Sequence, residues 1–500
     1  MNIEEKEKMA KRILPFLFIS LGCVATGFAN SDAEQLLKDR MRTPLLQTAG
    51  TLTGEGLCWH AAYNMDRFME KYRATSDTAF LDAAVKYYDA LIDKLRLAPD
   101  GYQGWVGPYI YDEKYICDVH VGDAILINPM LDFCETVLKR SRADIAKKYA
   151  ESAGKYLDLA RKHLIEKWDA RGTWHEDGPY GGYVSWDRYL TPDNLKEWRK
   201  LPVLKSVLSL PFNKQNTMAL ACLRLYRITG ESRYRERALK IFNFMKSRMC
   251  LYQDHYVWNY WEPFGPWDIN TNVPNTLFHW VNVHPYRNYQ AGEIDQMVEA
   301  YHSGITFTED DVRHIINTNL KVMWNGDSDH PAWKNSNYAV EMASLGKVSI
   351  DKAPGGEFPE LAGTLWRGLV DFDSTIRKLA KKPSDTPPSF KRKYSELPVT
   401  EFPVPFSNNC YLNLATVLPS VITKESPSFL VNQSRVSGPV EIALYSRDGK
   451  DKIRSIRAES KADDAGLLII KWDGKELSPG DYRIRWTLKD QYRDFPITVK

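Results

Sequence analysis

The 500-residue sequence has little net charge and, beyond its N-terminal region, no long hydrophobic segment. Its 67 basic and 64 acidic residues leave a formal net charge of +3, which provides no bulk field of the kind that attracts nucleic acid. We therefore expect no nucleic-acid partner. No later apolar run reaches the roughly 18 to 20 residues that a transmembrane helix needs, so we expect no membrane span in the mature protein.

Cysteine is scarce and is not arranged in pairs. The sequence has no CxxC motif and no regular cysteine spacing, so we expect neither a metal site built on cysteine nor a legible disulfide framework. A disulfide in an oxidising compartment stays open. Cys58, Cys134 and Cys222 lie among apolar residues of helical pattern, which predicts buried free thiols. Nothing in the sequence predicts a metal or a cofactor. The cysteines are Cys23, Cys58, Cys117, Cys134, Cys222, Cys250 and Cys410.

The N-terminus has the pattern of an export signal over residues 1–29. A basic start at Lys11 and Arg12 precedes the apolar run 13–24, which is too short to cross a bilayer comfortably. Small residues at Gly27 and Ala29 then suit a signal peptidase. We expect an exported protein, periplasmic or extracellular. Lipid anchoring through Cys23 is the alternative, which the serine three residues before it makes the weaker one.

Residues 30–382 have the pattern of paired helices. The segment 72–80 aligns without gaps on 226–234, and each copy lies at the turn between two helices. Repeated helical hairpins bury their apolar faces against their neighbours. We therefore predict a mainly α protein with an α/α toroid of four to six hairpins, with an open solenoid as the alternative. The expected helices are 55–73, 77–96, 121–139, 143–167, 214–229, 232–249, 292–304, 309–323 and 360–381.

The C-terminal part has a different character. Residues 383–426 are rich in proline and lack periodicity, which indicates a linker or an extended strap. Residues 427–500 contain alternating segments separated by glycine and proline turns, which predicts strands. The segment around Trp472 to Tyr482 is similar to the Ig-like modules appended to many secreted bacterial enzymes. That resemblance implies an Ig-like β-sandwich with an accessory role.

Aromatic residues are abundant, and they concentrate in three loops. The first loop, 101–123, contains several tyrosines and Trp105 before Asp118 and His120. Trp105 and Tyr109 are candidates to stack on flat ligands such as sugars, and Asp118 and His120 are candidates to transfer protons. The alternative is a packed loop whose aromatic side chains cover helix ends.

The second loop contains Trp174 and Trp186, which are further candidates for sugar contacts. It leads to a segment in which Gln215 and Asn216 begin an expected inner helix. Their amides could hydrogen-bond an anionic substrate group. Capping and packing are the alternative for both amides.

The third loop, 252–289, is the richest in aromatic residues and includes Trp258 and Trp261 as candidate sugar platforms. It also holds His284, Tyr286 and Arg287 within four positions. An amide and a guanidinium that neutralise a uronate carboxylate would acidify the neighbouring C–H. Tyr286 or His284 could then remove this proton, with Asn216 and Arg287 at the carboxylate.

The leaving oxygen in such an elimination would take its proton from Tyr260 or Tyr289. Hydrolysis would instead need two carboxylates that face each other across the scissile bond. The candidates for that pair are Asp118, Asp123, Glu262 and Glu293. A turn that contains Asp327, Asp329 and His330 could bind a cation, although a capped polar turn explains the same residues.

Four motifs together resemble the broad superfamily of α/α-toroid enzymes that act on acidic polysaccharides. They are Gly54–His60, the Tyr-Arg-x-Thr repeats, Asn213–Asn216 and Trp258–Pro263. The superfamily includes uronate lyases, unsaturated-uronyl hydrolases and the helical domain of glucuronyl epimerases. Related toroids often have an acidic pair and a histidine just before the helix that follows the Trp-rich loop, whereas this sequence has 287–291, Arg-Asn-Tyr-Gln-Ala, at that place.

Three functions follow from these patterns. The first is a secreted enzyme that cleaves an acidic glycan by β-elimination at a uronate. The second is a glycoside hydrolase that uses a carboxylate pair. The third is a glycan-binding protein without catalysis. All three have a glycan as partner, and the sequence leaves the oligomeric state open.

Overall fold

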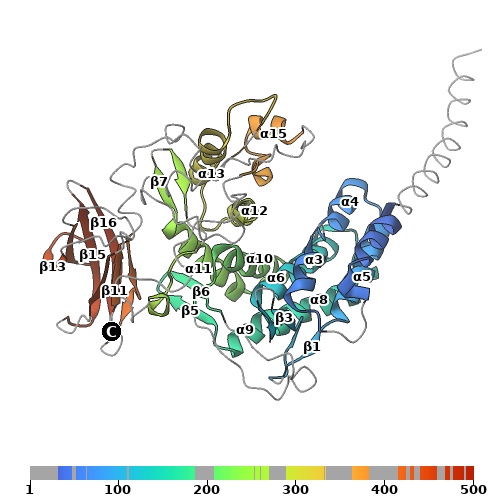
Figure 1. Cartoon of the computed structure of the whole chain (residues 1–500), viewed down its shortest axis with the longest axis horizontal. Helices are drawn as coiled ribbons and strands as arrows, with labels where there is room; N and C mark the ends of the chain where they lie inside the picture. Colours follow the sequence, from blue (N-terminus) through green and yellow to red (C-terminus); the bar gives the residue numbers. More distant parts are fainter. Residues whose placement is uncertain are drawn as a thin grey trace, which may run out of the picture. The chain divides into compact units, whose positions relative to one another are not determined.

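The computed structural model divides into two compact units, which we describe separately (Figure 1). The first unit comprises 1–171, 186–205 and 224–230, and the second comprises 172–185, 206–223 and 231–500. The structure describes residues 32–47, 52–63, 65–98, 100–109, 112–185, 208–252, 254–258, 261–269, 289–331, 333, 363–381, 415–423, 428–432, 440–458, 468–472, 477–488 and 491–500. The expected signal segment and most of the expected linker lie outside these residues.

The first unit is built mainly of helices. Helix α6 packs against α3 and α8, and α4 packs against α5. The expected helix 55–73 is wrong as one element, because the chain ends α3 at Ala62 and begins α4 at Arg67. The helices are α2 (Pro44–Gln47), α3 (Gly54–Ala62), α4 (Arg67–Thr75), α5 (Ala79–Ile92), α6 (His120–Glu135), α7 (Ala143–Lys148), α8 (Ala150–Ala160) and α9 (Lys167–Ala170). The π-helical segments Thr136–Arg140 and Arg161–Glu166 extend α6 and α8.

Short two-stranded sheets join these helices. In the first unit β1 (Arg96–Leu97) pairs with β2 (Gln103–Gly104), and β3 (Gly107–Tyr109) pairs with β4 (Asp112–Cys117). The second unit has two more pairs, β5 (Trp174–Asp177) with β6 (Tyr180–Tyr183) and β7 (Cys250–Tyr252) with β8 (His255–Val257).

The later helices lie close to their expected bounds. They are α10 (Phe212–Thr229), α11 (Ser232–Arg248), α12 (Tyr289–His302), α13 (Glu309–Asn317) with a π-helical extension Thr318–Met323, and α15 (Ser374–Ala380). A capping box between Thr308 and Asp311 begins α13. The expected helix 360–381 is wrong in its length. Asp373 caps a short α15 through the N–H groups of Thr375 and Ile376, so the chain has no helix across 370–373.

The internal repeat has the same backbone conformation in both copies. Ser76 follows α4 and Gly230 follows α10, and both lie in the left-handed region with φ of 58° and 78°. Their N–H groups donate to the carbonyls of Tyr72 and Tyr226, the first residues of the two aligned segments. Arg73 of the first copy pairs with Asp132 on α6. Arg227, its equivalent, pairs with Glu135 on the same helix. The sequence repeat therefore reflects a repeated helical turn.

The repeat makes a prediction about stability. Glycine adopts positive φ without the steric cost that a side chain adds, which is roughly 1 kcal/mol. We expect Ser76→Gly to raise the free energy of unfolding by up to about 1 kcal/mol and Gly230→Ala to lower it by a similar amount. A Cβ atom at Gly230 would meet nothing within 4 Å, so its cost is conformational. Urea denaturation of both variants checks this, and an unchanged stability of Gly230→Ala would contradict it.

The C-terminal part is a β region made of two sheets with one core. The five-stranded sheet has the order β10-β16-β15-β12-β13 and the three-stranded sheet has the order β14-β11-β9. Side chains at alternate positions, such as Ile442 and Leu444 or Ile484 and Trp486, are buried together with Leu430 of the other sheet. The strands are β9 (Ala415–Leu418), β10 (Val421–Ile422), β11 (Ser428–Asn432), β12 (Val440–Ser446), β13 (Lys452–Ala458), β14 (Leu468–Trp472), β15 (Gly480–Leu488) and β16 (Gln491–Val499).

This β region begins earlier than expected. Strands β9 and β10 lie before residue 427, and β10 pairs in parallel with β16 at the end of the chain. The Ig-like character of the region stays a prediction. The protein is thus mainly helical with a C-terminal β region, and closure of the helical hairpins into a ring also stays a prediction.

Three expected buried thiols are confirmed. Cys58, Cys134 and Cys222 are buried thiols that form no disulfide, and so is Cys117. Burial raises the pKa of Cys58 and Cys134, since a thiolate loses its hydration there. Across the described ranges, no helix is both long and apolar enough to cross a membrane.

Candidate functional site

The N-termini of α3 and α6 lie side by side in the first unit. Gly54 begins α3 with a positive φ of 61°, and a Cβ atom there would come within 2.7 Å of the backbone of Gly107 on β3. A Cβ atom on Gly122 of α6 would lie 3.1 Å from Cys58 Sγ of α3. The glycines therefore allow the two helix starts and the strand to approach closely. Acidic side chains from both helices lie at this junction.

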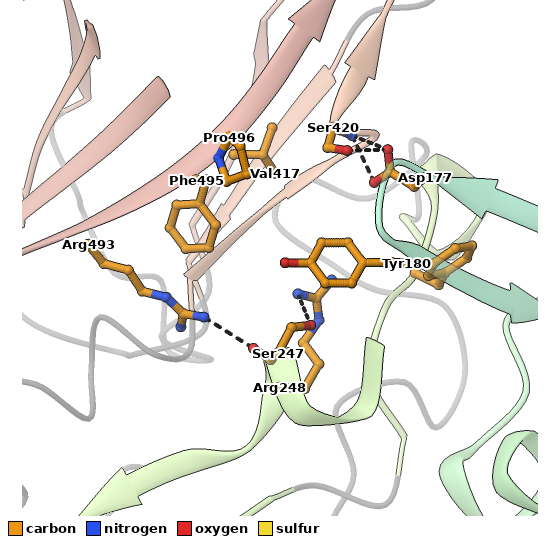
Figure 2. A pocket seen from close by; sticks show the side chains of 10 residues that line it. Asp177, Tyr180, Ser247, Arg248, Val417, Ser420, Arg493, Phe495 and Pro496 are labelled. Carbon is orange, nitrogen blue, oxygen red and sulfur yellow. Dashed lines mark hydrogen bonds between the residues drawn. The ribbon is translucent and has the colours of Figure 1, made fainter. Parts of the chain in front are cut away.

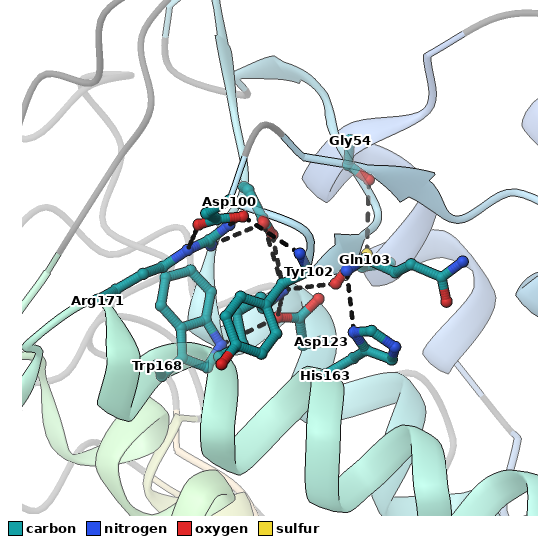
Figure 3. Close-up of polar contacts among 11 residues, drawn as sticks. Gly54, Asp100, Tyr102, Gln103, Asp123, His163, Trp168 and Arg171 are labelled. Carbon is teal, nitrogen blue, oxygen red and sulfur yellow. Dashed lines mark hydrogen bonds and ion pairs between the residues drawn. The ribbon is translucent and has the colours of Figure 1, made fainter. Parts of the chain in front are cut away.

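A buried ion network lies at the start of α6 (Figure 3). The Lys167 ammonium contacts Asp123 Oδ2 at 2.5 Å and both oxygens of Asp118 at 3.2 Å. Arg171 donates to Asp118 Oδ2 at 2.8 Å and to Asp100 Oδ2 at 2.8 Å. The Trp168 indole N–H donates to Asp123 Oδ2 at 3.0 Å. Two of the carboxylates expected from the sequence, Asp118 and Asp123, are thus brought together.

The residues that hold this pair come from the end of one helical segment. Lys167 and Trp168 directly follow the π-helical segment Arg161–Glu166. Arg171 is the C-cap residue of the short helix α9 that they begin. The i→i+5 hydrogen bonds of a π-helix shift the faces on which later side chains lie, and such segments are frequent at functional sites. The carbonyl of Gln103 accepts a further hydrogen bond from Lys167 at 3.1 Å. The lysine therefore has a partner for each of its three N–H donors.

The two aspartates have opposite pKa shifts. Burial raises the pKa of Asp123 to about 7, and the negative charge of Asp118 adds to this rise, although Lys167 opposes it. Burial also acts on Asp118, but Lys167 and Arg171 outweigh it and lower its pKa to about 2. Of the two carboxyl groups, Asp123 therefore holds its proton more readily and Asp118 is the one that ionises. Such a divided pair is the electrostatic arrangement that acid–base catalysis uses.

Glu55 is a third acid at this junction and was missed in the sequence. It is buried, its Oε1 accepts the indole N–H of Trp59 at 3.0 Å, and its Oε2 has no partner among the described residues. Burial raises the pKa of the Cys58 thiol, and the charges of Asp123, Glu55 and Asp118 add to this rise, so the three acids lie near the thiol. Trp59 is 38% exposed. We call Glu55, Asp118 and Asp123, together with Lys167 and Arg171, the acidic cluster.

Other residues expected in this region are part of the packing. The His120 ring stacks on Trp168 with 3.7 Å between centroids, which places it beside the acidic cluster. Trp105 is buried and its indole N–H donates to the Leu91 carbonyl at 2.8 Å. Its expected role as a sugar platform stays a prediction. Tyr109 ends β3, and its side chain lies outside the described part of the structure.

The second unit contains another buried acid, Glu293 on α12. Its Oε2 accepts the indole N–H of Trp258 at 2.6 Å, and its Oε1 has no partner among the described residues. Burial raises the pKa of Glu293 to about 8, although the Trp258 hydrogen bond acts in the opposite direction. Asn216 on α10 is also buried, with Nδ2 at 2.9 Å from Met245 Sδ and an unpartnered Oδ1. The raised pKa favours the neutral form of the Glu293 carboxyl at pH 7.

The buried Glu293 predicts a pH dependence of stability. Its folded pKa lies above the unfolded value of about 4.3, so the unfolded chain loses this proton first as the pH rises. Stability then falls between about pH 4.3 and 8, by roughly 1.4 kcal/mol per pH unit from this group alone. We expect Glu293→Gln to remove this slope and to be more stable than the wild type at pH 8. Denaturant unfolding from pH 5 to pH 8 measures how the free energy of unfolding changes with pH. The exposed Glu309→Gln is the control, and equal slopes in all three proteins would contradict the prediction.

The remaining described candidates of the second unit have structural contacts. Gln215 accepts the N–H of Tyr183 at 2.8 Å and donates to the carbonyls of Tyr183 and Leu210, so its amide fixes the end of β6. The Arg237 guanidinium lies over the Trp174 ring, 4.6 Å from its centroid. Trp261 donates to the Ser209 carbonyl at 2.6 Å, and Glu262 is buried. Their contact with a sugar or a reacting bond stays a prediction.

Several expected site residues lie outside the described part of the structure. They are Trp186, Tyr260, His284, Tyr286 and Arg287. The turn at 325–330 is described: Asp327 Oδ1 accepts the N–H groups of Asp329 and His330. These bonds are those of a capped polar turn.

Comparisons with known proteins give likenesses among solved structures. No known protein family and no curated protein matches the sequence. The GH76 alpha-mannanase BT2949 of Bacteroides thetaiotaomicron aligns with 61% of this chain and 60% of its own, at 12% identity and a TM-score of 0.34. The Lin0763 protein of Listeria innocua aligns with 42% of this chain and 50% of its own, at 19% identity and a TM-score of 0.26.

Proposed function

We propose that this protein is a carbohydrate-active enzyme that cleaves a glycan by acid–base catalysis at the acidic cluster. The observation that carries the proposal is the buried carboxyl pair at Lys167: burial and the charge of Asp118 raise the pKa of Asp123, whereas Lys167 and Arg171 lower the pKa of Asp118. A carboxyl group that is protonated at neutral pH can give its proton to a leaving oxygen. The aromatic loops of the sequence support a sugar as the substrate.

In this proposal Asp123 is the proton donor and Glu55 is the base. The Asp123 proton passes to the glycosidic oxygen as the C–O bond breaks, and a water molecule loses its proton to the Glu55 carboxylate as it attacks the sugar carbon. Glu55 suits this role because its Oε2 has no partner among the described residues. Asp118 is held by Lys167 and Arg171, and its charge adds to the rise that burial causes in the pKa of Asp123.

β-elimination at a uronate is the alternative mechanism that the sequence placed first. Its base and its carboxylate-binding arginine belong to 284–287, outside the described residues, so it stays a prediction. We further propose that the protein is exported and that its helical hairpins close into a toroid. The two repeated turns at Ser76 and Gly230 share the same left-handed backbone conformation, which supports the toroid.

A product assay tests these proposals. The protein from residue 30 onward would be incubated with uronate-containing and neutral polysaccharides, while new reducing ends and near-ultraviolet absorbance are followed together. Reducing ends without absorbance are expected for hydrolysis at the acidic cluster. A parallel rise in absorbance reports the double bond of an elimination product and would overturn hydrolysis. Binding without either product would favour a glycan-binding protein.

A further inference from the structure

A pocket within the second unit brings two arginines together (Figure 2). Arg248 at the end of α11 and Arg493 on β16 line it, together with Tyr180 at the start of β6. Asp177 and Ser420 lie at another side of the same space. The acidic cluster uses none of these residues.

Both guanidinium groups are held at Ser247. Arg248 Nη1 donates to Ser247 Oγ at 3.3 Å, and Arg493 Nη2 donates to the Ser247 carbonyl at 3.2 Å. Arg248 Nη2 donates to the Pro263 carbonyl at 3.2 Å. Arg248 is only 8% exposed, and its Nε has no hydrogen-bond partner among the described residues. A buried cation with a free donor therefore faces the pocket beside a second cation.

Burial acts against the positive charge of both arginines. Burial lowers the pKa of Arg248, and burial together with the charge of Arg248 lowers the pKa of Arg493 to about 10. Glu262, Asp177 and Asp268 act on Arg248 from nearby, but their attraction is smaller than the effect of burial. Two positive charges held close together in a buried site repel each other, and a bound anion removes this cost.

The nearby carboxylates are largely occupied by other donors. Asp177 accepts the hydroxyl and the N–H of Ser420 and the N–H of Val421. Asp268 accepts the hydroxyl and the N–H of Ser209. Its Oδ2 also accepts the N–H groups of Phe264 and Gly265. Neutral groups therefore hold both of these carboxylates in place, while the Nε of Arg248 has no partner among the described residues.

We propose that this pocket binds one compact oxyanion, a carboxylate or sulfate group, between Arg248 and Arg493. Guanidinium groups suit this ligand because their planar N–H donors match the oxygens of a carboxylate or sulfate. The Tyr180 side chain lies beside the two arginines and closes one side of the site (Figure 2). The group is either that of a free inorganic anion or the acid group of a sugar. The site does not depend on the proposed cleavage reaction.

Binding is tested with sodium sulfate, sodium glucuronate and glucose at constant ionic strength. Isothermal titration of the full chain is expected to give saturable binding of sulfate or glucuronate and none of glucose. Arg493→Gln is expected to weaken this binding at least tenfold. Arg248→Gln should do the same if it folds. The matched control is Arg447→Gln in the same unit, whose side chain is 83% exposed, and it should bind as the wild type does.

Each outcome decides a part of the proposal. Binding of glucuronate but not sulfate supports the pocket and assigns it to a sugar acid, whereas the reverse assigns it to a free inorganic anion. The absence of saturable binding of both anions overturns the proposal. Equal affinity in Arg493→Gln and wild type also overturns it, because Arg493 is only half-buried and does not belong to the hydrophobic core of the β region, so its loss leaves that core intact. Cleavage activity is not part of this readout.

Discussion

Asp123→Asn is expected to lower the rate of glycan cleavage by roughly 10²- to 10⁴-fold, the usual contribution of a general acid. The amide cannot donate a proton to the leaving oxygen. It can still accept the hydrogen bond that the Trp168 indole gives to Asp123, so the variant should fold. Initial rates of reducing-end release, compared with a circular dichroism melt, measure both effects.

The pH profile of the wild type gives an independent check of the same role. A general acid acts in its protonated form, and burial raises the pKa of Asp123 to about 7. Activity should therefore fall as the pH rises above about 7. Asp144→Asn is the matched control, because Asp144 lies exposed in the first turn of α7 and pairs only with the exposed Arg142 among the residues described. If Asp123→Asn cleaves as fast as Asp144→Asn, the role assigned to Asp123 is wrong.

Much of the helical fold could be predicted from the sequence because its signals are local. The capping residues Thr308 and Asp311 lie three positions apart, and the turn residues Ser76 and Gly230 lie within an aligned repeat. The break between α3 and α4 had no such signal. Asp373 caps α15, but the pattern of apolar residues continued across it, so the sequence predicted one long helix there.

The acidic cluster could be predicted only in part. Asp118, His120 and Asp123 stood out because they end an aromatic loop. Lys167 and Arg171 lie 49 and 53 positions after their partner Asp118, and a basic residue on a helix has the same sequence pattern whether it is buried or solvated. Glu55 belonged to a motif that supported the family resemblance, but its unpaired Oε2 is a property of the packing. The pairing of charges that lie far apart in the sequence is therefore the part of the acidic cluster that the sequence does not predict.

Lys167→Met is expected to destabilise the first unit by about 3–5 kcal/mol, the usual cost of removing one partner from a buried ion pair. Lys167 is fully buried, and its loss leaves Asp123 without its ammonium partner and Asp118 with Arg171 alone. Denaturant unfolding measures the change. Lys155→Met is the matched control, because the Lys155–Asp89 pair is about half exposed, and it should cost less than about 1 kcal/mol.

The pH dependence of this loss separates charge from packing. Without Lys167 the folded-state pKa of Asp118 loses a cause that holds it below the unfolded value of about 3.9, and that of Asp123, already above this value, rises further. The unfolded chain then releases these protons first, so the deficit of Lys167→Met grows as the pH rises from 4 toward 8. Adding Asp123→Asn removes one of the two carboxyls and should recover part of the lost stability at pH 8. A deficit that is the same at pH 5 and pH 8, with no recovery in the double variant, would mean that Lys167 acts through its packed methylene chain and not through its charge.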